Sequence, residues 1–179
     1  FKFEPMEFPP CHLAVAFDSP GSTFRHDLFP SYKAQRQAMP EDLAASLPWI
    51  QRIIQAMNIP ALICPGFEAD DIIGTVARRA EAAGFHTWMV TPDKDFAQLV
   101  SEHTTLFRLA AGRDAESYTP ADLHGKWGVE RPEQIIDLLG LQGDTSDNIP
   151  GVPSVGPKTA QKLLAEYGSI EGALAAAPS

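Results

Sequence analysis

Short apolar runs alternate with stretches of helical periodicity over the first half of the chain. Continuous apolar runs predict buried strands over residues 12–17, 61–64 and 86–91. Apolar positions at helical spacing predict helices over residues 41–57, with a kink or restart at Pro48, and 69–83. This alternation predicts an α/β fold whose mainly parallel sheet is covered by helices on both faces.

Beyond about residue 118 the pattern becomes wholly helical. Helices are predicted over residues 120–127, 132–139, 158–167 and 169–176. The loop 110–116 is the predicted boundary between two parts. Residues 1–116 are therefore expected to form an α/β body, and residues 117–179 a helical module.

Acidic residues stand where the predicted strands end. Asp18, Glu68 and Asp93 each lie just beyond a strand. Because functional sites of such sheets form at the carboxyl ends of the strands, these three side chains are expected to meet on one rim.

Three acids are grouped in the segment G-F-E-A-D-D. Glu68 and Asp71 lie three apart on one helical face, with Asp70 beside them. Helix capping explains one or two of these acids, but adjacent like charges cost stability unless a cation neutralises them. Metal binding is the favoured interpretation of this cluster.

Two further pairs of acids give weaker signals. Asp93 and Asp95 lie two apart at a strand end, which is also common in turns. Asp144 and Asp147 lie three apart, which suits a single turn or the N-cap of a helix. Oxygen ligands without histidine or cysteine favour magnesium or manganese over zinc, and two such ions suit hydrolysis of a phosphodiester. None of the five histidines falls in an acidic cluster, so they are interpreted as surface or core residues.

A glycine-punctuated segment follows the last acids. Residues 151–156 (G-V-P-S-V-G) are predicted to form a hairpin whose backbone N–H groups precede a helix, beside Lys158 and Lys162. This arrangement favours a phosphate site. A helical packing unit whose glycines only permit tight turns is the alternative.

A basic segment near the start of the chain is a second candidate for nucleic-acid binding. Arg25, Lys33 and Arg36 lie near Tyr32, a combination that suits a phosphate backbone and a stacked base. Solvated surface charge is the alternative interpretation.

The bulk composition limits these interpretations. The chain of 179 residues has 44% hydrophobic residues, which is typical of a globular protein. Its net charge of −9 weakens a nucleic-acid interpretation. Eight carboxylates, however, fall in the motifs above, where bound cations would reverse the sign of the local charge.

Cys11 and Cys64 form neither a disulfide framework nor a C-x-x-C spacing, which favours a reducing cytoplasm. No apolar segment approaches the ~18 residues that a membrane helix needs.

Four segments together resemble a known family. They are A-F-D-S-P-G-S-T-F-R-H-D-L-F-P-S-Y-K-A-Q-R, G-F-E-A-D-D-I-I-G-T, T-P-D-K-D-F-A-Q-L and G-D-T-S-D-N-I-P-G-V-P-S-V-G-P-K-T-A. In this order, and over nearly the whole chain, they resemble the 5′-nuclease (5′-3′ exonuclease) domain of bacterial DNA polymerase I, within the flap-endonuclease superfamily. The resemblance implies a PIN-like α/β body followed by a helix-hairpin-helix module of the helix-three-turn-helix type. It also implies cleavage of phosphodiesters near the 5′ ends of DNA, including flaps and RNA primers.

The resemblance implies roles for individual residues. The ligands of two or three Mg²⁺ or Mn²⁺ ions, or acids next to those ligands, would be Asp18, Glu68, Asp70, Asp71, Asp93, Asp95, Asp144 and Asp147. The candidate catalytic residues are Asp18 and the cations that would contact the scissile-strand phosphates, Arg25, Lys33 and Arg36. The hairpin would grip duplex DNA, with a K⁺ ion held by its carbonyls. The expected DNA-binding residues are Arg25, Tyr32, Lys33, Arg36, Gly151, Val152, Ser154, Gly156, Lys158, Thr159 and Lys162.

The expected partners are branched or nicked DNA with a 5′ flap, RNA primers and a polymerase domain of the same chain. A monomer associated with the bacterial nucleoid is expected. The family opens with a strand that ends in Asp-Gly, and no such element precedes Asp18, so the chain is a fragment or the protein lacks that strand. The alternatives to a metal-dependent 5′-nuclease are a catalytically silent DNA-binding module, a PIN-type ribonuclease and, more distantly, a phosphatase that uses D-x-D.

Overall fold

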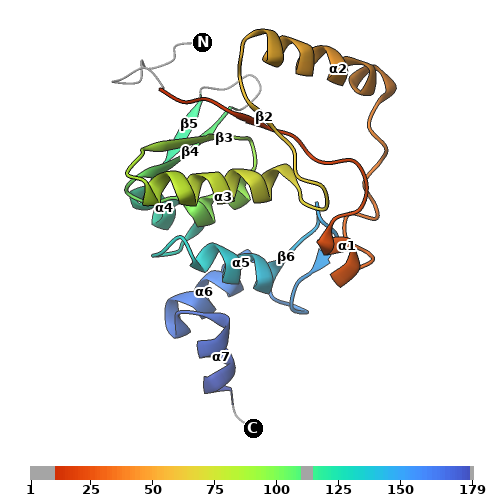
Figure 1. The fold of residues 1–179 in the computed structure, drawn as a ribbon. Helices are drawn as coiled ribbons and strands as arrows, with labels where there is room; N and C mark the ends of the chain where they lie inside the picture. Colours follow the sequence, from red (N-terminus) through yellow and green to blue (C-terminus); the bar gives the residue numbers. More distant parts are fainter. Residues whose placement is uncertain (1–10, 110–114, 178–179) are drawn as a thin grey trace. The chain divides into compact units, whose positions relative to one another are not determined.

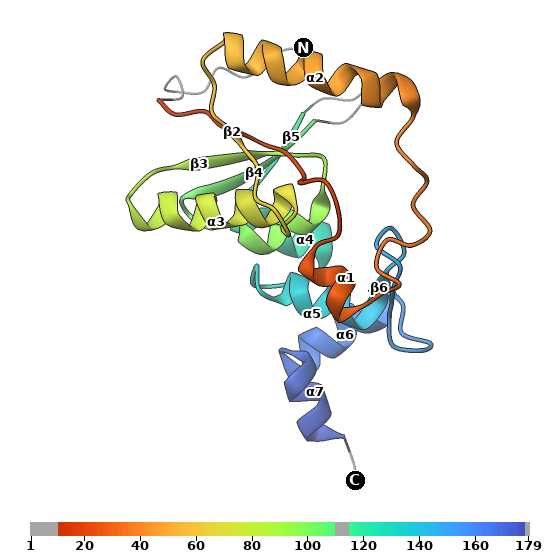
Figure 2. The same cartoon turned by 45° about the vertical axis from the view of Figure 1, so that its right-hand side comes forward.

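The computed structural model describes residues 11–109 and 115–177. The chain separates into two compact units, residues 1–75 and 76–179, and each is considered by itself. The order of the elements can be followed by colour in Figure 1 and from a second side in Figure 2. Helix α3 (Ala69–Ala82) runs from the first unit into the second.

The described residues of the first unit form two short parallel strands and two helices, ahead of the start of α3. Strand β1 (Val15–Ala16) pairs with β2 (Ala61–Leu62), so the strands predicted at these places are confirmed but are shorter than expected. Between them lie α1 (Phe24–Leu28), which was not predicted, and α2 (Glu41–Ala56). Five residues are too few for a helical period to be visible in the sequence, which explains why α1 was missed.

Helix α2 differs from the prediction in two ways. It is a single helix that includes Pro48, so the predicted restart is absent. Its apolar positions are not buried: Leu43, Ile50 and Met57 are 47%, 38% and 64% exposed. Leu47 and Ile54 are half-buried. The helical period therefore identified the helix correctly, but the described residues cover its apolar face only in part.

The second unit is built on a three-stranded sheet. Strand β3 (Thr87–Val90) is parallel to β4 (Thr104–Arg108), and β4 is antiparallel to β5 (Glu116–Tyr118). The prediction of β3 is confirmed, whereas β4 and β5 were missed because neither is a continuous apolar run. The short helix η1 (Lys94–Leu99) follows β3 and packs against both β4 and α5.

The rest of the second unit is mostly helical, as predicted. After η2 (Pro120–Asp122), the helices are α4 (Leu123–Trp127), α5 (Gln134–Gln142), α6 (Pro157–Tyr167) and α7 (Ile170–Ala176). Fully buried apolar side chains of these helices, such as Leu123, Ile135 and Leu164, form its core with Leu106 of β4. The expected α/β architecture with a helical C-terminal part is therefore present, although this sheet has one parallel and one antiparallel pair of strands.

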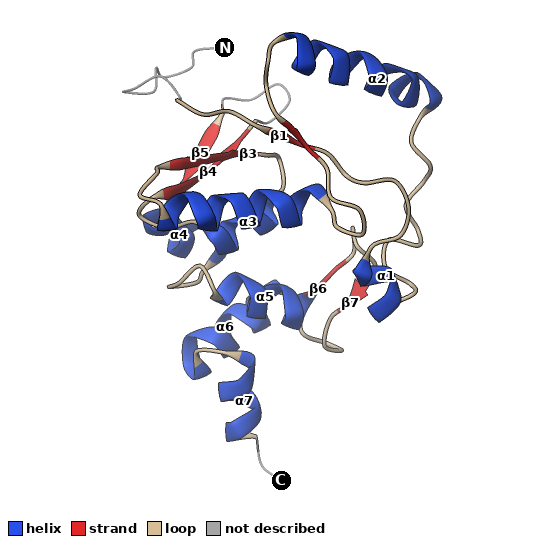
Figure 3. Cartoon of the chain, in the orientation of Figure 1, coloured by secondary structure: helices blue, strands red, loops and turns tan. Residues whose placement is uncertain are grey.

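The region after residue 118 is not wholly helical. Two short antiparallel strands, β6 (Gly143–Asp144) and β7 (Ile149–Pro150), interrupt it between α5 and α6 (Figure 3). Gly143 ends α5 with a φ of 75°, in the left-handed region that glycine adopts readily. Two-residue strands carry no detectable period, so the sequence pattern could not show them.

The predicted boundary at residues 116/117 falls within β5, and residues 110–114 of the predicted loop lie outside the described residues. The boundary stays a prediction. Among the helices of the described residues, none combines the length and the apolar character that crossing a membrane requires.

Candidate functional site

The buried carboxylate of Glu68 is the centre of a charged cluster in the first unit. Its residue is 7% exposed. The Lys33 Nζ atom lies 2.9 Å from both Glu68 carboxylate oxygens, and the Tyr32 hydroxyl donates to Oε2 at 3.0 Å. A buried carboxylate is costly unless it is paired and hydrogen-bonded, and these contacts meet that requirement.

Asp71 forms a second ion pair beside Glu68. The Arg25 guanidinium donates to both Asp71 oxygens at 2.8 Å, and the Glu68 backbone N–H donates to Asp71 Oδ2 at 2.9 Å. The Arg25 hydrogen bond is the main cause of the lowered pKa of Asp71, with burial acting against it. The same bond raises the pKa of Arg25. Both groups are therefore charged at neutral pH.

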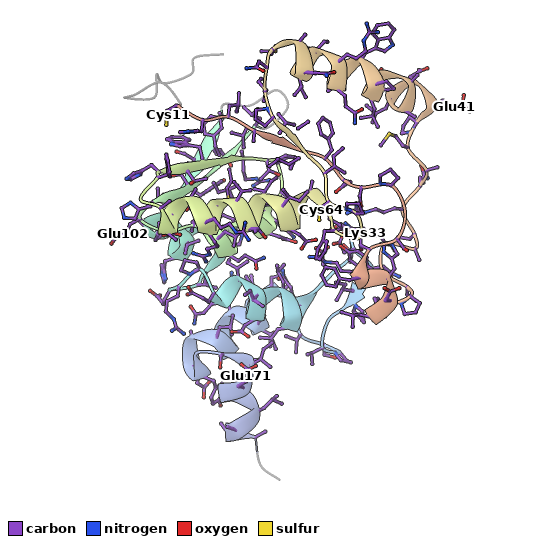
Figure 4. All side chains as sticks on the ribbon, in the orientation of Figure 1. Cys11, Lys33, Glu41, Cys64, Glu102 and Glu171 are labelled. Carbon is purple, nitrogen blue, oxygen red and sulfur yellow. The ribbon has the colours of Figure 1, made fainter. Side chains whose placement is uncertain are left out.

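Helix α1 and the turn after it place Arg25 and Lys33, respectively, on this cluster. Lys33 has a φ of 55°, and Tyr32 is 4% exposed. Figure 4 labels Lys33 beside α1. The buried Tyr32 ring offers no open face to a base, so the structure favours support of Glu68 over the stacking role predicted for Tyr32. Arg36, which is exposed, stays a predicted phosphate contact.

The other acids of the first unit lie at the start of α3. Asp18 Oδ1 accepts a hydrogen bond from Ala69 N at 2.7 Å, and Asp70 is exposed in the first turn. Asp18 and Asp71 thus satisfy backbone donors at a helix start, and for Asp71 this agrees with the capping alternative. Among the residues that the structure describes, the Glu68 carboxylate makes no such capping contact. Metal binding by this group stays a prediction.

The acids of the second unit are less well compensated. Asp93 caps η1, since its Oδ1 accepts from Asp95 N at 2.9 Å. Asp95 Oδ1 is buried and has no hydrogen-bond partner among the described residues. Burial, followed by the charges of Asp93 and Asp144, raises the pKa of Asp95 to about 7, although Lys94 acts against this.

Asp144 is held in the turn between β6 and β7. Its Oδ1 accepts from the backbone N–H of Ser146 at 2.8 Å and from the Ser146 hydroxyl. Burial acts to raise the pKa of Asp144, but the Ser146 hydrogen bonds and Lys94 outweigh it and lower the pKa. The negative charge of Asp144 therefore favours the protonated form of Asp95.

A divalent cation fits the residues of this second group. They offer only oxygen ligands, they carry like charges that raise each other's energy, and one buried oxygen lacks a partner. Within the described ranges, however, no group of three or more His, Cys, Asp or Glu side chains is already arranged to hold a metal ion. The structure brings acids together within each unit. The rim that would join Asp18 and Glu68 to Asp93 and Asp144 stays a prediction.

The predicted hairpin starts from a close backbone contact. A Cβ atom on Gly151 would lie 2.3 Å from the backbone carbon of Gln142, so two chain segments touch where only glycine fits. Val152 N donates to Leu141 O at 2.8 Å. Gly156 is the N-cap of α6, which places Lys158 in the first turn of that helix.

Replacing Gly151 with alanine is expected to destabilise the protein by about 1–3 kcal/mol, because the backbone must shift to admit the added methyl group. The matched control is Gly125→Ala in α4, where no atom lies within 4 Å of the added Cβ. That change is expected to stabilise by about 0.5–1 kcal/mol. Urea unfolding measures both, and an unchanged midpoint for Gly151→Ala would contradict the close contact.

Several contacts that matter here were not visible in the sequence. The Ser19 hydroxyl donates to Phe67 O at 3.1 Å and fixes the segment before Glu68. The Tyr32–Glu68 bond and the orphaned oxygen of Asp95 were also missed. Each depends on residues brought together by folding, and no local spacing indicates them.

Two family models match the chain almost end to end. One, described as the 5′-3′ exonuclease N-terminal resolvase-like domain, matches residues 5–128, and the other, the 5′-3′ exonuclease C-terminal SAM fold, matches residues 130–179. DNA polymerase I of Bacillus caldotenax is 48% identical over 170 residues, which is 94% of this chain and 19% of that protein. DNA polymerase I of Bacillus subtilis is 47% identical over 163 residues, 90% of this chain and 18% of that protein. The chain thus spans about a fifth of the length of these relatives.

Solved structures agree with this assignment. The T5 D15 protein co-crystallised with metal ions superposes with a TM-score of 0.78 at 25% identity, over 94% of this chain and 66% of that one. The catalytic core of Rad2 in complex with a DNA substrate has a TM-score of 0.57 at 18% identity, over 88% of this chain and 48% of that one, which shows a shared fold.

Proposed function

The chain belongs to the 5′-3′ exonuclease family, and we propose that it acts as a divalent-cation-dependent, structure-specific 5′-nuclease on DNA in replication and repair. The observation that carries the proposal is the acid group Asp93, Asp95 and Asp144, with its buried, unpartnered oxygen. Perturbed, uncompensated carboxylates are concentrated at functional sites because ordinary folding selects against them.

Mg²⁺ or Mn²⁺ is the proposed cation, in two to three copies. All the candidate ligands are carboxylates, and hard oxygen ligands select these ions. A divalent cation held by such residues supplies a Lewis acid that activates water and stabilises the charge on phosphate oxygens. The T5 5′-exonuclease has been solved with bound zinc, which supports a metal site in a similar fold.

The residues of this chain have distinct proposed roles. Asp93, Asp95 and Asp144 hold cations, together with the other candidate ligands Asp18, Glu68, Asp70, Asp71 and Asp147. Arg25 and Lys33 bind the phosphates of the cut strand, with Arg36 beside them. Their side chains are 31% and 17% exposed in their ion pairs with Asp71 and Glu68, so a phosphate can reach them without unfolding the cluster.

The hairpin is proposed to hold duplex DNA through its backbone, with K⁺ at its carbonyls.

Replacing Lys158 with alanine is expected to weaken binding to all DNA sequences alike. It should also lower the slope of log binding constant against log salt concentration by about 0.9, since one phosphate contact is lost. The control is Lys126→Ala. Lys126 lies in α4, outside the hairpin, and its Nζ atom is 3.6 Å from Glu116 Oε2. Fluorescence anisotropy over a salt series measures both slopes. An unchanged slope for Lys158→Ala counts against the phosphate contact.

A metal titration tests the proposed activity. Cleavage of a 5′-flap DNA and of a single-stranded RNA is followed as Mg²⁺ is added, together with binding of the same flap. Mg²⁺-dependent cutting of the flap near its base supports the proposal. Flap binding without cutting at any Mg²⁺ concentration indicates a catalytically silent DNA-binding module, and preferential cutting of the RNA indicates a ribonuclease.

The wider setting is also part of the proposal. The relatives are full-length DNA polymerase I proteins, which supports a polymerase domain in the same polypeptide. The proposed substrates are nicked or flapped duplexes that retain an RNA primer. The protein is proposed to act on them as a monomer at the bacterial nucleoid.

A further inference from the structure

Two histidines face each other at the edge of the sheet in the second unit. His86 directly precedes β3, and His103 directly precedes β4. The two strands are parallel neighbours with Thr87 opposite Thr104, and Thr87 N donates to His103 O at 2.8 Å. The two histidines therefore occupy corresponding positions at the starts of adjacent strands, and their side chains lie together. Both residues are exposed.

The two ring nitrogens are hydrogen-bonded to each other, at a separation that one metal ion can also bridge. His103 Nδ1 lies 3.1 Å from His86 Nε2, and the ring centroids are 4.7 Å apart with the planes at 89°. A Zn–N bond is about 2.05 Å, so two nitrogens at this separation would subtend about 98° at a shared ion. That angle lies between the square-planar and tetrahedral values. Exposed rings can turn about χ2 to direct both lone pairs to one point.

A carboxylate adds negative charge beside the pair. Glu81, in the last turn of α3, lies 3.3 Å from Arg78 Nη1. A hydrogen bond from the Ser101 hydroxyl is the main cause of its lowered pKa, burial opposes it, and the charges of Arg78 and His103 contribute. Glu102, which Figure 4 labels at the end of the sheet, is a further acid between Ser101 and His103. The surroundings therefore favour a cation.

We propose that His86 and His103 form a surface chelate for a divalent transition-metal ion of the Cu²⁺, Ni²⁺ and Zn²⁺ class, with water completing its coordination. The described residues offer no third ligand already in place, so this is a two-imidazole site. Imidazole selects these ions, whereas Mg²⁺ requires oxygen ligands, so the site is chemically distinct from the carboxylate groups. The bound ion ties the starts of β3 and β4 together and stabilises the folded state.

Titration of the untagged protein with Cu²⁺ in excess Mg²⁺ tests the site. Electron paramagnetic resonance is expected to show two imidazole nitrogens on the ion. Either His86→Asn or His103→Asn should leave one nitrogen and weaken Cu²⁺ binding by roughly tenfold or more, as losses of metal-site residues do. Ni²⁺ should raise the melting temperature of the parent but not of these variants. The matched control is His124→Asn, an exposed histidine that contacts Glu130 instead.

Two results would overturn the proposal. One is a single-nitrogen spectrum from the parent protein, and the other is unchanged Cu²⁺ affinity in both variants. If the variants fold poorly, nuclear magnetic resonance of the parent protein alone still tests the proposal. Substoichiometric Zn²⁺ must perturb the ring signals of His86 and His103 before those of the other histidines, and perturbation of the others first contradicts the site.

Discussion

Replacing Asp144 with asparagine is expected to reduce Mg²⁺-dependent cleavage of 5′-flap DNA by about a hundredfold or more, while binding of the duplex is retained. Asparagine keeps an oxygen that can accept the Ser146 N–H bond, so the turn between β6 and β7 is preserved. It removes the negative charge that a divalent cation requires. Loss of a residue that only supports a metal ligand lowers metal affinity or activity by about 10–100-fold. Loss of a ligand itself should lower them at least as much. Asp93→Ala is expected to act in the same direction.

The control for this prediction is Glu102→Gln, an exposed acid of the same unit that belongs to neither acidic group. It removes one negative charge without touching the proposed site. Cleavage is measured as a single-turnover rate, and duplex binding is measured without divalent cations. If Asp144→Asn cut the flap at the parental rate, Asp144 would not be a metal ligand.

Replacing Asp95 with asparagine is expected to stabilise the metal-free protein above neutral pH and to remove its response to Mg²⁺. The pKa of Asp95 is raised from 3.8 to about 7, so between these values the folded state binds a proton that the unfolded state has lost. The parent therefore loses stability as pH rises from about 4 to about 7. Asparagine is uncharged, like the protonated acid, so the variant does not lose stability in this way. At pH 8 the free energy of unfolding of the variant is expected to exceed that of the parent by about 1 kcal/mol. This value already takes into account that Asp95 is partly exposed, which weakens the effect.

Mg²⁺ should stabilise the parent at pH 8 because it binds the folded state and neutralises the same charges. The variant should show little of this stabilisation. Thermal unfolding at several pH values, with and without Mg²⁺, measures both effects, and Glu102→Gln again serves as the control. A variant less stable than the parent at pH 8, or equally stabilised by Mg²⁺, would show that Asp95 is not an uncompensated acid of a metal site.

The main elements of the fold could be predicted from the sequence because their signals are local. Helices α2, α3, α5 and α6 each contain enough turns for apolar residues to repeat with a visible period. The acidic clusters and the glycine-punctuated hairpin are likewise short segments, and their order identified the family. Elements such as α1, β6 and β7 were missed because two to five residues cannot show a period.

The state of each acid was decided only by tertiary structure. Asp71 and Asp95 each lie within two positions of another aspartate in the sequence, yet Asp71 meets Arg25, which is 46 positions away, whereas Asp95 meets the like charge of Asp144. One pKa falls and the other rises in consequence. Desolvation and Coulomb energies depend on distances through space, which sequence separation does not reveal. The sequence therefore determined which residues carry the chemistry, and the folded structure determined which of them are left in need of a cation.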